Sequence, residues 1–198
     1  MQWEKFTSGD ASLFAIGAFC DGWWCAYCVD PDKLNCIDIP SDAPAKFGML
    51  FTESEAGKAL PKKLMPTKQN KLLENIAYLE LLIVYVSIFE HKLKWRGLHV
   101  PIYSDNKNVI AWLTKNTAGS IEAARLLRYI LDLCVELNIR IMPFYIDTKT
   151  NKIADTLSRL EWNKFCEAVN DPKFHVPPRM WAPYPVAQQD FVDHTVQA

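Results

Sequence analysis

The chain has 198 residues, of which 49% are hydrophobic and 23% charged, and its formal net charge at pH 7 is −1. These values fit one globular domain with some additional length, and the near-neutral charge does not by itself indicate a nucleic-acid-binding protein. No apolar run reaches the roughly 18 residues needed to cross a bilayer, and residues 1–20 lack the pattern of a secretory signal. We therefore expect an intracellular protein, cytoplasmic or nuclear, that is not secreted and has no membrane partner.

The N-terminal part of the chain contains three segments that alternate like short strands. An antiparallel meander is the simplest arrangement for them, with Asp21-Gly22 typical of a hairpin turn. Asp10 lies in the first segment among small residues, which would let other groups approach its carboxylate. The three segments are residues 3–12, 13–20 and 23–29.

Four of the six cysteines crowd into residues 20–36, and two of them have a C-x-x-C spacing. In an intracellular protein, thiols or metal ligands are expected more often than disulfides. A zinc site would need two pairs presented on turns, whereas this C-x-x-C lies in an aromatic, strand-like run. We favour small buried core residues and leave zinc open for the four, which are Cys20, Cys25, Cys28 and Cys36.

Residues 30–69 lose periodicity and contain five prolines, which predicts a long connection with some structure around residues 46–51. A connection of this length inside a compact domain is often functional or mobile. The stretch from Ala56 to Lys71, at the end of this connection and just beyond it, is rich in lysine, and clustered cations can follow a phosphate backbone. A solvated face that balances acids elsewhere is the alternative. The lysines are Lys58, Lys62, Lys63, Lys68 and Lys71.

Residues 69–95 have the clearest helical periodicity, and Gly97 follows as a stop. Glu80 is the exception, because its helical neighbours are apolar or small. A buried carboxylate needs a partner or a metal ion, since an unpaired buried charge is costly. The alternative is that Glu80 escapes to solvent at the rim of the apolar face.

A strand over residues 98–105 leads directly into a helix that Asn106 can cap. Pro101 removes a backbone donor, so we expect regular pairing to begin only near Ile102. Asp105 stands at the carboxyl end of this strand, where open α/β sheets bind ligands. The alternative is a carboxylate that does no more than help to cap the helix.

The remainder of the chain alternates helices and strands, which indicates parallel pairing and a covered sheet. Ser120 can cap a helix over 121–138, and Pro143 suits an edge strand over 139–146. Asp155 lies in the first turns of a helix over 148–159. A short helix over 161–169 is followed by a tail rich in proline and aromatic residues, which we expect to lie on a neighbouring surface or to bind a partner.

Four motifs in this order resemble the ribonuclease H domain of retroelement reverse transcriptases, most closely the DIRS-like and Ty3-like groups. The resemblance covers about residues 5–160, so we expect a ribonuclease H-like domain over 1–160 and an appended helix and tail over 161–198. The last motif is the most specific. The motifs are Asp10-Ala11-Ser12 with Gly17-Ala18, Tyr78-Leu79-Glu80-Leu81, Ser104-Asp105-Asn106 with Val109-Ile110-Ala111-Trp112, and Asn151-Lys152-Ile153-Ala154-Asp155-Thr156-Leu157-Ser158-Arg159.

The resemblance implies an α/β fold with a five-stranded mixed sheet, three antiparallel strands and then two parallel ones, flanked by helices. It also implies an endonuclease that cuts the RNA strand of RNA/DNA hybrids with two Mg²⁺ ions, or Mn²⁺ in their place. The catalytic and metal-binding residues would be Asp10, Glu80, Asp105 and Asp155. Candidate substrate contacts are Asn106, Lys107, Asn108 and Arg125.

Two departures from the family leave alternatives open. Tyr145-Ile146-Asp147-Thr148 stands where relatives often have His-Ile-Pro-Gly, and the connection over 30–69 is long. The chain could be a nuclease for another RNA substrate, or a non-catalytic scaffold or interaction module that kept the fold. It could be part of a larger polyprotein or a host-adopted descendant. A reverse transcriptase polymerase domain, or another protein bound through the tail, is a candidate partner beside the nucleic acid.

Overall fold

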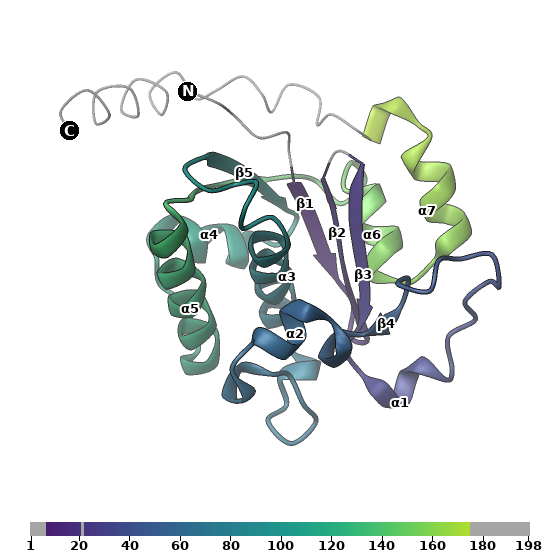
Figure 1. The fold of residues 1–198 in the computed structure, drawn as a ribbon, viewed down its shortest axis with the longest axis horizontal. Helices are drawn as coiled ribbons and strands as arrows, with labels where there is room; N and C mark the ends of the chain where they lie inside the picture. The colour runs from purple at the N-terminus through teal and green to yellow at the C-terminus, as the bar shows by residue number, and fades with distance from the viewer. Residues whose placement is uncertain (1–6, 21, 175–198) are drawn as a thin grey trace.

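The computed structural model describes residues 7–20 and 22–174, which form a mixed sheet between two layers of helices (Figure 1). The order of the strands is β4-β3-β2-β1-β5-β6. β1, β2 and β3 are antiparallel, whereas β5 and β6 continue from β1 in parallel, and β4 is parallel to β3. The strands are β1 Thr7–Ala11, β2 Ala15–Cys20, β3 Trp23–Cys28, β4 Met49–Leu50, β5 His99–Ser104 and β6 Arg140–Tyr145.

The predicted α/β class and the change from antiparallel to parallel strands are confirmed, but the predicted count of five strands is wrong. The additional strand is β4, which has two residues, pairs with the end of β3 and lies within the predicted connection. Such a short pairing leaves no alternation in the sequence to read. The start of the first predicted strand, Asp21 of the predicted turn and residues 175–198 of the tail lie outside the described residues.

The helices cover both faces of the sheet. α3, α4 and α5 pack with one hydrophobic cluster, and α6 and α7 pack with the other. None of the described helices is long and apolar enough to cross a membrane. The helices are α1 Pro31–Leu34, α2 Glu55–Ala59, α3 Ile76–Glu90, α4 Lys107–Lys115, α5 Ile121–Leu137, α6 Lys152–Ser158 and α7 Trp162–Val169, with 3₁₀ turns at Phe51–Glu53, Lys62–Leu64, Leu72–Glu74 and Pro172–Phe174.

α3 is the central helix of the larger layer, and every residue from Tyr78 to Ile88 is buried. A helix that is apolar on all sides belongs in a core. It is shorter than the predicted range of 69–95, because Lys71 has a left-handed backbone (φ 58°) and the Asn75 side chain caps the helix. The Asn75 Oδ1 atom accepts a hydrogen bond from the Tyr78 backbone N–H at 3.0 Å.

The long connection between β3 and α3 is packed against α3. Phe51, Leu60 and Leu64 belong to the same hydrophobic cluster as this helix. The Tyr78 hydroxyl donates to the Leu64 carbonyl at 2.6 Å, and the Tyr85 hydroxyl donates to the Ala56 carbonyl at 2.9 Å. Because both hydroxyls come from α3, the connection is fixed to the helix that carries Glu80.

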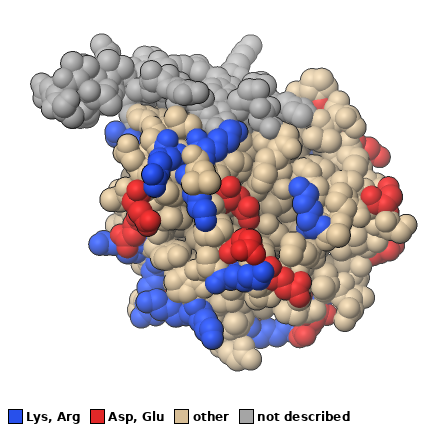
Figure 2. All heavy atoms as spheres, viewed as in Figure 1, with Lys and Arg blue, Asp and Glu red and all other residues tan. Residues whose placement is uncertain are grey.

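The five lysines of this segment are exposed. In Figure 2, basic side chains gather along the lower edge of the molecule, where Figure 1 has α2 and the turn that follows it. Lys58 pairs with Glu55 at 3.0 Å, and Lys68 pairs with Asp32. Part of this positive charge is therefore already balanced by neighbouring acids.

Pro101 does not interrupt the pairing of β5 with β6. Among the described residues, β5 pairs with β1 at Ile102 and Tyr103, opposite Thr7 and Ser8, whereas its pairing with β6 begins already at His99, earlier than predicted. In a parallel ladder each residue directs its N–H to one neighbour only, so a missing donor need not interrupt the other side. Pro143 lies in β6, which is an edge strand as predicted.

Candidate metal centre

Three carboxylates from distant parts of the chain meet at one end of the sheet. Asp10 is in β1, Glu80 is in the second turn of α3, and Asp105 follows β5 directly. One side-chain oxygen from each lies within 4.8 Å of the others, so the three could hold a metal ion. β1 and β5 are parallel, with Ser8 opposite Tyr103. Continuing this pairing by two residues brings Asp10 beside Asp105.

A glycine lets α3 approach β1 closely. A Cβ atom at Gly9 would lie 2.7 Å from the Cγ2 atom of Ile83, which is closer than real Cβ contacts. A side chain at residue 9 would therefore force Ile83 to shift away from β1. Because Ile83 is one helical turn from Glu80, this approach also brings the Glu80 carboxylate to the end of the sheet.

Glu80 is only 5% exposed, and two residues beside Asp105 bind its carboxylate. The Ser104 hydroxyl donates to Oε2 at 2.9 Å, and the Asn106 side-chain amide donates to Oε1 at 3.4 Å. Ser104 Oγ in turn accepts the Asn106 backbone N–H at 3.0 Å. The residues on both sides of Asp105 in the sequence therefore orient the second carboxylate of the centre.

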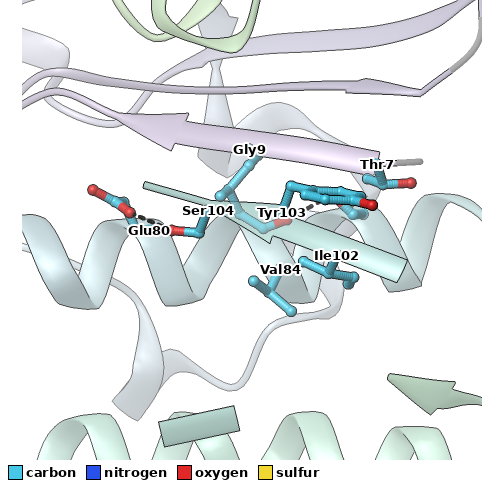
Figure 3. A pocket seen from close by; sticks show the side chains of 9 residues that line it. Thr7, Gly9, Glu80, Val84, Ile102, Tyr103 and Ser104 are labelled. Carbon is cyan, nitrogen blue, oxygen red and sulfur yellow. Dashed lines mark hydrogen bonds between the residues drawn. The ribbon is translucent and has the colours of Figure 1, made fainter. Parts of the chain in front are cut away.

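A small cavity lies beside this pair, between α3 and strands β1 and β5 (Figure 3). Glu80 and Ser104 lie at one end of it, and Thr7 lies at the other. It has room for about one water molecule. Glu80 is thus surrounded by protein on this side and depends on Ser104 and Asn106 for its hydrogen bonds.

Burial and the negative charges of Asp10 and Asp105 together raise the pKa of Glu80 to about 8, against the hydrogen bonds from Ser104 and Asn106. Asp10 behaves similarly: burial and the charges of Asp105 and Asp155 together raise its pKa to about 6, against a hydrogen bond from Ser158. The Ser158 hydroxyl lies 2.6 Å from Asp10 Oδ2. Ionising both carboxyls together is therefore unfavourable without a nearby cation.

Asp155, the fourth predicted ligand, is near this group of three but is not one of its members. Both of its carboxylate oxygens are bound by cations on the same helix. Lys152 Nζ lies 3.3 Å from Oδ2, and Arg159 Nε lies 2.7 Å from Oδ1. The structure thus brings three of the four predicted carboxylates together and joins the fourth to two basic side chains.

The predicted substrate contacts fall into two groups. Asn106, Lys107 and Asn108 follow Asp105 at the start of α4, and the last two are exposed. The Asn106 side chain makes two hydrogen bonds. Its Oδ1 accepts the Asn108 N–H at 3.0 Å, as predicted for a helix cap, and its amide donates to Glu80. Arg125 is exposed on α5, a helix that carries none of the three carboxylates.

Sequence reasoning missed the contacts made by Ser104, Ser158, Lys152 and Arg159. A signal was present for the last two, because a cation three or four residues from a carboxylate on a helix commonly pairs with it. No comparable signal pointed to Ser158, which contacts Asp10 across 148 residues of sequence.

The donor atoms suit a hard divalent cation. Mg²⁺ and Mn²⁺ prefer carboxylate oxygens, and an ion among the three acids would remove the cost of their mutual repulsion. Within residues 7–20 and 22–174, no second group of three or more potential ligands is found, so no zinc cluster involves the cysteines there. Cys20, Cys25 and Cys28 are buried, as expected for core residues, while Cys36 is exposed.

Comparison of the chain with protein-family models, curated proteins and solved structures finds no match. The interpretation of the centre depends on its own geometry and chemistry.

Proposed function

We propose that this protein is a metal-dependent endonuclease of the ribonuclease H type that hydrolyses the RNA strand of RNA/DNA hybrids with two Mg²⁺ ions. The observation that carries the proposal is the convergence of Asp10, Glu80 and Asp105 within 4.8 Å. The burial and raised pKa values of Asp10 and Glu80 favour a bound cation. The mixed sheet between two helical layers agrees with the ribonuclease H-like fold that the sequence motifs imply.

Asp10, Glu80 and Asp105 would hold the ions. Bound divalent ions at such a centre activate an attacking water and stabilise the leaving oxygen of a phosphodiester. Ser104 and Asn106 keep the Glu80 carboxylate in position, and Ser158 does the same for Asp10. As a fourth ligand, Asp155 would have to exchange at least one of its ion pairs.

The alternative of a non-catalytic scaffold is less well supported. Two of the three carboxylates are buried, and a protein gains no stability from buried carboxyls that repel one another. On our proposal the chain is the ribonuclease H part of an intracellular retroelement reverse transcriptase, or a host-adopted descendant of one. A polymerase domain would then be its natural protein partner.

The test is cleavage of an RNA/DNA hybrid labelled separately on each strand, with Mg²⁺ or Mn²⁺. Asp105→Asn is compared with Asp132→Asn, which removes an exposed carboxylate on α5. We expect cutting of the RNA strand by the wild type and by the Asp132 variant, and none by the Asp105 variant. Single-stranded and double-stranded RNA are offered in parallel, because preferential cutting of either would support the alternative substrate. Absence of cutting of every substrate by folded protein would refute the nuclease.

A further inference from the structure

Asp155 holds two basic side chains at the edge of the carboxylate centre. Its own side chain is only 14% exposed, whereas the side chains of Arg159 and Lys152 are 56% and 40% exposed. The carboxylate is therefore largely buried, and its two cations extend into solvent. Ion pairs of this kind fix the orientation of the cation as well as its position.

Arg159 is bound to Asp155 through Nε, which leaves the terminal amino groups of the guanidinium for other partners. Within the described residues, the Arg159 side chain hydrogen-bonds and ion-pairs with Asp155 alone. A planar guanidinium with its terminal donors available matches the geometry of a phosphate group. Asp10 also acts on this guanidinium, since its negative charge contributes to raising the pKa of Arg159, after the larger contribution of Asp155.

The position of Arg159 relative to the centre is fixed by the preceding residue. The Ser158 hydroxyl contacts Asp10 Oδ2 at 2.6 Å and the Asp155 backbone carbonyl at 2.9 Å. The last turn of α6 is therefore joined directly to the carboxylate centre. Arg159 follows Ser158 in this turn and is exposed, so a polyanion that reaches Asp10 passes close to it.

We propose that Arg159 and Lys152 form an anion-binding subsite that holds a backbone phosphate of the nucleic acid beside the carboxylate centre. The inference rests on the proposed function and names additional residues that bind its substrate. A centre of three acids repels a polyanion, and a chain with net charge −1 offers little general attraction. Two fixed cations next to the acids would provide local attraction where the phosphodiester must approach.

An ordinary surface ion pair is the competing explanation, and the chain contains a matched example. Arg128 Nε pairs with Asp132 Oδ1 at 3.1 Å on α5, with the same spacing of four residues and the same donor atom. There, however, the two side chains are 79% and 65% exposed. Arg128→Gln thus removes the same charge and the same type of pair from a helix that carries none of the three carboxylates.

The experiment measures binding of a fluorescent RNA/DNA hybrid by anisotropy over a range of NaCl concentrations, with EDTA to prevent cleavage. Each phosphate contact contributes about one unit to the slope of log K against log salt concentration. We expect Arg159→Gln to lower this slope by about one and to weaken binding several-fold. Arg128→Gln is expected to match the wild type. Lys152→Gln, which leaves the Arg159–Asp155 pair in place, is expected to give a smaller loss in the same direction.

If Arg159→Gln, Arg128→Gln and the wild type give equal slopes of log K against log salt concentration, the subsite is wrong. Cleavage of the hybrid by the wild type would in that case still support the proposed function. If the wild type neither binds nor cuts the hybrid, the proposed function fails and the subsite fails with it. Thermal unfolding of each variant is measured alongside. If Arg159→Gln does not fold, the salt dependence of binding by Lys152→Gln is the test of the subsite. A slope equal to that of the wild type would reject it.

Discussion

Asp10 and Gly17 lie directly opposite each other in the β1–β2 ladder, and helix α6 occupies the space that a side chain at Gly17 would need. A Cβ atom there would come within 2.5 Å of Leu157 Cβ and 2.7 Å of the Ser158 backbone nitrogen. This close approach allows Ser158 to reach Asp10. Residue 17 therefore controls a hydrogen bond of the carboxylate centre without taking part in it.

Replacing Gly17 by alanine is expected to push α6 away from the sheet. Overpacking of this kind costs about 1–3 kcal/mol, and the obstacle here includes backbone, which cannot rotate aside as a side chain can. We expect a loss of unfolding free energy in urea toward the upper end of this range, together with weaker Mg²⁺ binding. Gly119→Ala is the control, because the nearest atom to its Cβ would be 4.0 Å away. Similar stability of the two variants would contradict the prediction.

The stability of the metal-free protein is expected to fall as pH rises from about 4.5 to about 8 because of Glu80. The pKa of this carboxyl is about 8 in the folded protein against an ordinary value of 4.5, so the folded state binds more protons than the unfolded state between these values. The free energy of unfolding then decreases with pH. Urea unfolding at several pH values in EDTA measures the slope, which Glu80→Gln should reduce and Glu136→Gln, an exposed residue of α5, should not.

Saturating Mg²⁺ is expected to offset part of this loss at pH 8, because an ion that binds only the folded state adds about 2.7 kcal/mol at one hundred times its dissociation constant. The effect should disappear in Asp105→Asn and persist in Asp132→Asn. The readout is the thermal midpoint with and without the ion. An equal rise in the Asp105 variant would place the bound ion elsewhere.

Ser104 is expected to tune metal binding through Glu80. Loss of a residue that orients a metal ligand typically lowers metal affinity about 10–100-fold. The hydrogen bond from Ser104 lowers the pKa of Glu80, so Ser104→Ala should also shift metal binding to higher pH. Ser104→Thr keeps the hydroxyl and should retain most of the affinity in Mn²⁺ calorimetry. Ser87→Ala, a buried serine whose hydroxyl donates to the Ile83 carbonyl instead, should behave like the wild type.

Asp155→Asn separates two roles for this residue. As the anchor of Arg159 and Lys152, it should be dispensable for the Mg²⁺-induced rise in thermal midpoint but important for affinity toward the hybrid. Asp10→Asn should instead abolish the rise in midpoint. If Asp155→Asn loses the Mg²⁺ effect as completely as Asp10→Asn, Asp155 is a ligand of the ion that stabilises the fold.

The parts of the fold that could be predicted from sequence are those determined locally. Asn106 and Ser120 were expected to cap the helices that they do cap. The burial of Glu80 followed from the apolar residues around it on α3. In each case, one or two helical turns of sequence contain the relevant physical information.

The remainder depends on contacts between distant segments. Some structure was predicted around residues 46–51, but the pairing of Met49 with Tyr27 was not, because that pairing is decided by how the connection packs. The same limit applies to Ser158, whose contact with Asp10 exists because residue 17 has no side chain. Asp155 pairs with Lys152 and Arg159 instead of joining the group of three carboxylates. The sequence alone does not show whether these nearby cations or the distant carboxylate centre will be its partner.

Both edges of the sheet are poor templates for a further strand. β4 offers only two residues at one edge, and β6 at the other edge carries Pro143, which has no N–H to donate. Sheets with long, regular edges tend to recruit strands from other molecules and aggregate. The short β4 and the proline of β6 therefore act against self-association through strand addition, and on the proposed function this would keep the neighbouring end of the sheet open to a nucleic acid.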